Sequence, residues 1–128
     1  MKRLCKIQSL ALASIFMFSA STVAVSSDWS GWERFGSHDN VDIYWKYMDN
    51  SCGSHIRWKA VNNSERDVWP SVNKKRYTCE NGDVDSASDE TIGSVNLSPG
   101  SSSSTQADTC LCNGRGGVIS ASVSIVIK

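Results

Sequence analysis

The sequence predicts an all-β protein, an antiparallel β-sandwich of about 6 to 7 strands stabilised by disulfide bonds. Several short segments alternate apolar and polar residues, which is the period of a strand with one buried face. Turn-forming residues separate these segments at intervals of about 8 to 15 residues. No segment carries an apolar stripe of helical period.

The first two predicted strands are residues 41–48 and 55–61, which alternate most regularly. The loop between them, rich in Asn, Ser and Gly, is too short for a parallel crossover. We therefore expect the two strands to be antiparallel neighbours. The segment before them, residues 27–40, is expected to be an irregular arm whose aromatic rings cap the core.

The middle of the chain gives weaker signals. Residues 68–72 are predicted as an edge strand because Pro70 has no N–H to donate. Residues 74–76, Lys-Lys-Arg, are interpreted as a solvated strand end or turn. Residues 76–80 form a strand that enters a tight Asn81-Gly82 turn. We expect an acidic loop at 83–90, a strand at 91–97 and a flexible low-complexity segment at 101–108.

The last strand is predicted at residues 118–128. There Ile and Val alternate with Ser, so that residues 119, 121, 123, 125 and 127 face the core. The order of strands and loops over the chain is similar to that of many small extracellular immunoglobulin-like domains, which implies an immunoglobulin-like sandwich. A small β-barrel is the alternative.

Residues 1–26 have the three parts of a secretory signal peptide: a basic start, a short apolar run and small residues near a cleavage point. The apolar run is too short to span a bilayer. We therefore expect cleavage, a secreted or periplasmic location, no membrane insertion of the mature chain, and a single domain over residues 27–128.

Charge argues against a nucleic-acid partner. Three of the 13 basic residues lie in the signal, so residues 27–128 carry ten basic and 13 acidic residues, a net charge of −3. A net charge of this sign gives no electrostatic argument for a nucleic acid or an anionic membrane as partner.

Four cysteines remain after cleavage: Cys52, Cys79, Cys110 and Cys112. An even number in an exported domain indicates two disulfides. A bond between Cys110 and Cys112 would have to span about 6 to 7 Å within one strand, at the limit of disulfide reach. We expect each of these two to pair with Cys52 or Cys79, and the sequence leaves both cross-pairings open.

Catalysis has little support. The two histidines, His38 and His55, have no serine in a nucleophile-elbow context nearby. We expect a non-enzymatic protein without a cofactor or a structural metal. Asp83, Asp85 and Asp89 alternate as carboxylates do in calcium loops, but the EF-hand pattern fails at its glycine and its last glutamate, which leaves a weak calcium candidate.

The aromatic residues point to binding. Five Trp, three Tyr and one Phe follow the signal, and those outside the predicted buried faces are Trp29, Trp32, Tyr44 and Trp69. Exposed rings on a rigid β-scaffold stack on sugars or anchor protein partners. The sequence thus predicts an exported binding module for a carbohydrate or protein. The alternatives are a structural or accessory subunit of a surface or periplasmic assembly and, third, a small secreted hydrolase.

Overall fold

The structure, a computed structural model, describes residues 28–93 and 96–128. Within these residues it contains nine β-strands and no helix, which confirms the all-β prediction. The predicted signal peptide, residues 1–26, lies outside the described residues. None of the described residues belongs to a helix that is long and apolar enough to cross a membrane.

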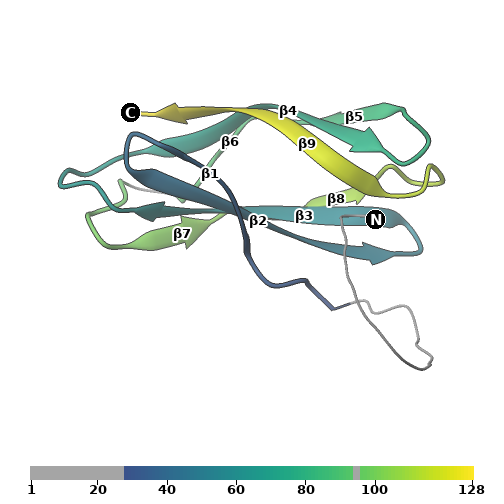
Figure 1. The fold of residues 1–128 in the computed structure, drawn as a ribbon, viewed down its shortest axis with the longest axis horizontal. Coiled ribbons are helices and arrows are strands. Elements are labelled where there is room, and N and C mark those ends of the chain that lie inside the picture. Colours follow the sequence, from purple (N-terminus) through teal and green to yellow (C-terminus); the bar gives the residue numbers. More distant parts are fainter. Residues whose placement is uncertain (1–27, 94–95) are drawn as a thin grey trace.

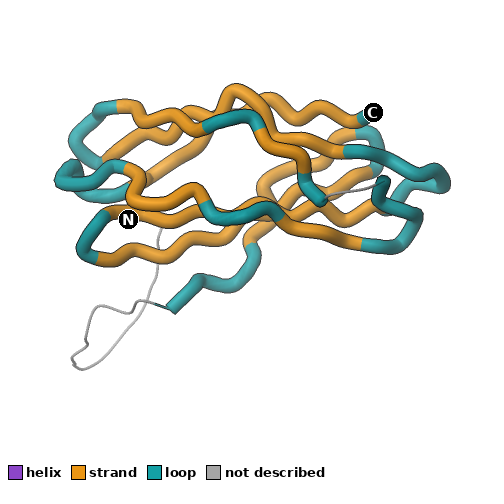
Figure 2. Tube along the Cα trace, turned by 180° about the vertical axis from the view of Figure 1, so that it is seen from behind, coloured by secondary structure: helices purple, strands orange, loops and turns teal. Residues whose placement is uncertain are grey.

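The strands form two separate antiparallel sheets in a sandwich-like arrangement (Figure 1). The first sheet consists of β1 (Glu33–His38), β2 (Val41–Asn50), β3 (Gly53–Asn62), β7 (Ser102–Ser104) and β8 (Asp108–Leu111). The second consists of β4 (Pro70–Cys79), β5 (Val84–Ala87), β6 (Glu90–Thr91) and β9 (Val118–Ile127). Figure 2 shows the same two layers from behind, with loops gathered at their ends.

The first sheet is built around the hairpin of β2 and β3. Every residue of β2 has a partner in β3, from Val41 opposite Asn62 to Asn50 opposite Gly53. The predicted antiparallel pair is therefore confirmed. The strand β1 covers the other side of β2, so the expectation of an irregular arm over residues 27–40 is wrong for its second half. Only residues 28–32 of the described part precede β1 as an arm.

The second sheet is centred on β4, which pairs with β9 on one side and with β5 and β6 on the other. The predicted edge strand at 68–72 is wrong, because Pro70 is the first residue of this central strand. A proline is tolerated there because the first residue of a strand can do without a ladder N–H. The Asn81-Gly82 turn joins β4 to β5, and the Gly82 N–H donates to the carbonyl of Cys79 at 2.8 Å.

The predicted acidic loop at 83–90 and flexible segment at 101–108 are also wrong in part. The first contains β5 and the start of β6, and the second contains β7 and the start of β8. These strands are short and polar, so hydrophobic alternation does not mark them, and backbone pairing with β4 or β3 holds them in place. They explain why the structure has more strands than expected. The predicted strand at 91–97 is reduced to Thr91 and an isolated bridge at Leu97 among the described residues.

A bulge in β4 decides which of its side chains face the core. Lys74 has a positive φ of 52°, and the pairing with β9 shifts register between Asn73 and Arg76. The Asp89 carboxylate accepts the Lys74 N–H at 2.8 Å and so holds the bulge. A bulge inserts one residue into the alternation. Val72 and then Lys75, Tyr77 and Cys79 consequently point inward and are buried. The expectation that Lys75 is solvated is wrong.

The core lies between the sheets. Its buried apolar residues come from both: Val41, Ile43, Ile56, Trp58 and Ala60 from the first, and Val72, Tyr77 and Val118 from the second. Trp58 stacks on Trp45 with ring centroids 5.7 Å apart, and Phe35 meets Trp58 edge-on at 4.9 Å. These ring contacts pack the part of the core that lies beneath β1.

The last strand, β9, is an edge strand, and its inward residues after Val118 are only partly buried. Its register against β4 shifts between Thr78 and Cys79, so that Val118 faces inward and Ile119 stands in the bulge, 41% exposed. The expectation that Ile119 faces the core is therefore wrong. The alternation holds from residue 121 onward, where Ala121, Val123, Ile125 and Ile127 pack against the core.

The structure contains both disulfides that the sequence predicted. Of the two cross-pairings left open, it has Cys52–Cys110 and Cys79–Cys112. Cys110 and Cys112 both have positive φ, 53° and 56°, so the chain turns sharply at each. The first bond ties β8 to the β2–β3 turn in its own sheet, and the second ties the segment after β8 to the end of β4 in the other sheet.

Candidate functional site

The outer face of the first sheet presents aromatic and cationic side chains side by side. Tyr44 and Lys46 alternate on β2 with the inward residues, and Lys59 of β3 lies directly opposite Tyr44 in the strand register. All three are partly exposed. Because both strands are central to a fully paired hairpin, these side chains stand at fixed spacings on a rigid surface.

The arm of residues 28–32 lies along this face. Ser30 donates its backbone N–H to the Tyr47 carbonyl at 2.8 Å, and the Tyr47 N–H donates to the Ser30 hydroxyl at 3.0 Å. Figure 1 shows the arm leaving β1 on the side of the first sheet that faces away from the second. This attachment brings Trp29 and Trp32 onto the outer face, where both are partly exposed.

Rings and ammonium groups alternate across the face. Lys46 Nζ lies 5.1 Å from the centre of the Trp29 ring and 4.7 Å from that of Trp32. Lys59 Nζ lies 4.9 Å from the Trp32 ring and 5.2 Å from the Tyr44 ring. We call this order, Trp29, Lys46, Trp32, Lys59 and Tyr44, the aromatic–lysine row. Each cation–π contact at such a partly exposed site contributes about 0.5 to 1 kcal/mol, so the row is pre-ordered.

Three of the four predicted binding residues thus lie together, and Trp69 does not belong to them. Trp69 precedes β4 in the other sheet, where its N–H donates to the Lys128 carbonyl at 2.8 Å. Its side chain is exposed, at 45%. The two lysines were missed by sequence reasoning. The alternation of the two strands could have identified them, because Lys46 and Lys59 occupy outward positions beside Tyr44.

The weak calcium candidates do not form a carboxylate cluster among the described residues, and Arg115 pairs with both Asp83 and Asp85. Asp83 accepts from Asn81 at 3.2 Å, while Asp89 holds the Lys74 bulge. Asp85 accepts the Cys112 N–H at 2.6 Å and pairs with Arg115 at 2.8 Å. Those two contacts, with the Cys112 N–H the larger, lower the pKa of Asp85 below its usual value. These contacts indicate that Asp85 anchors the turn at Cys112.

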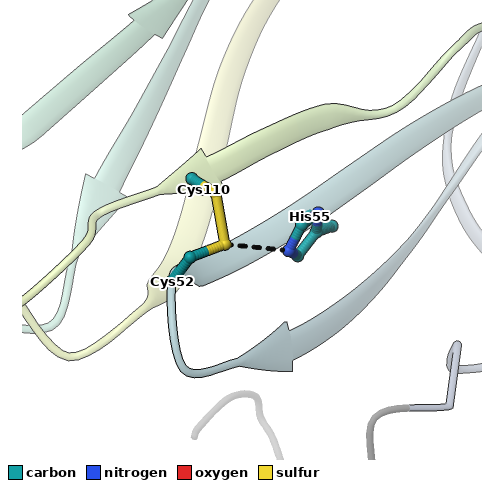
Figure 3. A group of neighbouring side chains, drawn as sticks. All are labelled: Cys52, His55 and Cys110. Atoms are coloured by element: carbon teal, nitrogen blue, oxygen red, sulfur yellow. Dashed lines mark hydrogen bonds between the residues drawn. A yellow bond between two sulfur atoms is a disulfide. The ribbon is translucent and has the colours of Figure 1, made fainter.

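The histidines are likewise dispersed. His38 is exposed and lies 3.8 Å from Asp39. His55 places Nε2 3.4 Å from Cys52 Sγ, beside the disulfide to Cys110 (Figure 3). This trio, and another of Cys79, Asp85 and Cys112, have the spacing of metal ligands in the described part of the chain. Both contain a disulfide, and a bonded sulfur is not the thiolate that a metal needs.

A second polar constellation lies in the core and was not predicted. Lys75 is buried, and its Nζ donates to Asp108 Oδ2 at 2.9 Å, to Asp108 Oδ1 at 3.1 Å and to Glu90 Oε1 at 3.2 Å. Tyr77 donates its hydroxyl proton to Asp108 Oδ2 at 2.7 Å and accepts from Trp58 Nε1 at 2.9 Å. We call these five residues the buried lysine cluster. It joins β4 and β6 of the second sheet to β3 and β8 of the first.

The direction of the hydrogen bonds in this cluster is fixed. An indole N–H can only donate, so the Tyr77 oxygen accepts from Trp58 and must give its own proton to Asp108. Burial first, and then the Asp108 carboxylate, raise the pKa of Tyr77 far above its ordinary value. The phenol therefore stays protonated and remains a donor to Asp108.

Comparison of the chain with protein-family models, with curated proteins and with solved structures found no match.

Proposed function

We propose that this protein is an exported, non-enzymatic binding module on an immunoglobulin-like scaffold, secreted or periplasmic, and that its ligand is an acidic carbohydrate. The observation that carries the proposal is the aromatic–lysine row on the outer face of the first sheet. The two disulfides are consistent with an extracellular protein.

The chemistry of the row favours a saccharide. A pyranose ring has an apolar face of C–H groups that packs on an aromatic ring, and partly exposed Trp and Tyr side chains supply such surfaces. Three rings in sequence, Trp29, Trp32 and Tyr44, suit consecutive sugars of a chain better than a single small molecule. Because β2 and β3 are rigid, little conformational entropy is lost when the ligand binds.

The lysines favour an anionic saccharide over a neutral one. Residues 27–128 carry a net charge of −3, yet this face sets Lys46 and Lys59 between its rings. A carboxylate or sulfate on a sugar that stacks on Trp32 would lie near both ammonium groups. Such pairs contribute to affinity and are screened by salt.

The test is a binding measurement with a uronic-acid polymer, a sulfated polymer and a neutral glucan of similar length. We expect binding to the acidic polymers that weakens as salt is added. The variant Trp32→Ala removes the ring that touches both lysines and should weaken binding at least about tenfold, as loss of a central anchor does. Trp69→Ala is the matched control, because it removes an exposed Trp on the other sheet and should bind as wild type.

A second pair of variants separates charge from stacking. Lys46→Gln with Lys59→Gln should abolish the salt dependence and lower affinity for the acidic polymers. Wild-type protein that binds none of the three polymers, or Trp32→Ala protein that binds as well as wild type, would contradict the proposal. Trp32-dependent capture of a protein, without polymer binding, would contradict the carbohydrate ligand.

A further inference from the structure

The buried lysine cluster holds a primary amine against two carboxyl groups inside the core. The side chain of Lys75 has 0% exposure, and those of Asp108 and Glu90 have 14% and 27%. Nζ contacts both oxygens of Asp108 and one oxygen of Glu90. A lysine is almost never fully buried unless it is paired, and this one faces two partners of opposite charge.

The surrounding structure sets the position of this amine. The bulge at Lys74, held by Asp89, turns Lys75 toward the other sheet. Glu90 follows one residue after Asp89 and is held in turn by the Gln106 N–H, which donates to its Oε2 at 3.2 Å. The remaining oxygen, Oε1, is the one that faces Nζ. The amine of Lys75, the carboxyl group of Asp108 and that of Glu90 are thus held on three separate strands, β4, β8 and β6.

We propose that Lys75 and Asp108 condense into an intramolecular isopeptide bond, with Glu90 carrying the proton, so that the two sheets acquire a second covalent link beside the Cys79–Cys112 disulfide. Nothing about this modification depends on the carbohydrate proposal. The residues are separated by 33 positions in the sequence and lie on β4 and β8, in different sheets.

The step balances without a co-reactant. A proton first passes from the Lys75 ammonium to Asp108, which leaves a neutral amine and a neutral carboxylic acid. The lone pair of Nζ attacks Asp108 Cγ as the carboxyl group rotates to present its face, and the Nζ–Cγ bond forms. Glu90 takes a proton from nitrogen and returns it to Oδ1, the Cγ–Oδ1 bond breaks, and one water leaves. Nothing is oxidised or reduced.

Tyr77 determines which carboxyl oxygen of Asp108 remains in the amide. Its hydroxyl donates to Oδ2 at 2.7 Å, so negative charge that develops on this oxygen during the attack is stabilised by a hydrogen bond already in place. Trp58 orients that hydroxyl from behind. The other oxygen, Oδ1, accepts from Lys75 Nζ at 3.1 Å, and it is the one that departs because the Tyr77 hydroxyl holds Oδ2. Glu90 and Asp108 also line a pocket with residues 86–89 and Thr109, which gives the released water a path to solvent.

Two physical reasons make condensation favourable here although it is unfavourable between free acids and amines in water. Reactants held in contact by a fold act at effective concentrations of ~10⁵ M or more. Burial of an ammonium and a carboxylate also carries a large desolvation cost. A neutral amide in the same place, together with a water released to bulk, removes both charges from the core.

The experiment is intact mass spectrometry of the folded protein after reduction and alkylation of all cysteines. We expect a mass lower than that of the processed sequence by one water. Trypsin cannot cleave after an acylated lysine, and the sequence has no Lys or Arg between Arg76 and Arg115. Digestion should therefore yield the peptide 77–115 with Lys75-Arg76 attached through Asp108.

Variants locate the reaction. Lys75→Arg and Asp108→Ala should show the full mass, and so should Glu90→Gln, which keeps size and polarity but cannot carry the proton in the same way. Circular dichroism and the absence of free thiols should show that Glu90→Gln is folded. Wild-type protein of full mass, or a water deficit that maps elsewhere than to the branched peptide, overturns the proposal. An unchanged deficit in Glu90→Gln overturns the role of Glu90.

Discussion

Gly53 is the position where a single added carbon should disturb the most structure. It begins β3, has a φ of +130°, and faces the backbone of β8. A β-carbon there would collide with the Leu111 carbonyl oxygen and would lie 3.1 Å from the Cys110 carbonyl carbon and 3.2 Å from that of Leu111. These neighbours are backbone atoms between two disulfide-bonded cysteines, so they cannot move aside as a flexible side chain would.

The expected cost of Gly53→Ala has two parts. A non-glycine residue at this φ costs about 1 to 3 kcal/mol in backbone strain. Displacement of β8 from β3, which also disturbs the buried Leu111, adds about 1 to 3 kcal/mol, as overpacking does elsewhere. The free energy of unfolding should therefore fall by about 2 to 6 kcal/mol.

Urea denaturation with the disulfides intact measures this loss. Gly82→Ala is the matched control, because Gly82 also has a positive φ, +94°, but has nothing within 4 Å of the β-carbon position. It should lose only the backbone-strain part, about 1 to 3 kcal/mol. Equal losses in the two variants would refute the argument that close approach of β8 requires glycine at position 53.

Three further predictions concern the disulfides, pH and the last strand. The oxidised mature protein should show no free thiol in an Ellman assay, and loss of either disulfide should lower stability by about 3 to 4 kcal/mol; two titratable thiols would contradict the pairing. Because the folded-state pKa of Asp85 is lowered, its ionised form stabilises the fold above the unfolded pKa of about 4, and this contribution is lost as pH falls through the folded value. Asp85→Asn should therefore reduce the fall in melting temperature between about pH 6 and about pH 2, and an unchanged fall would argue against the Cys112 anchor. Val118→Ala should cost about 1.5 kcal/mol in denaturation experiments, whereas Ile119→Ala, in the exposed bulge, should cost less than about 0.5 kcal/mol; the reverse order would place Ile119 in the core.

Local patterns were sufficient where a strand has one buried and one exposed face and no bulge interrupts its alternation. The β2–β3 hairpin, the Asn81-Gly82 turn and the β-class follow from the period of two and from turn chemistry. The two disulfides followed from the number of cysteines and the short Cys110–Cys112 spacing. Three of the four proposed binding aromatics also lie on one face, because Tyr44 alternates with inward residues and the arm carries both tryptophans to it.

Tertiary structure decided which short polar segments become strands and which side chains a bulge turns toward the core. Short polar strands such as β5 and β7 do not alternate apolar and polar residues. They are strands because their backbones pair with β4 and β3, respectively. The positive φ at Lys74 shifts the alternation by one residue and thereby buries Lys75. The sequence by itself determined the all-β class and the number of disulfides, while the folded structure selected between the two cross-pairings. The cluster of Lys75, Glu90 and Asp108 depended on the packing of two sheets, because residues distant in sequence meet only when both are folded.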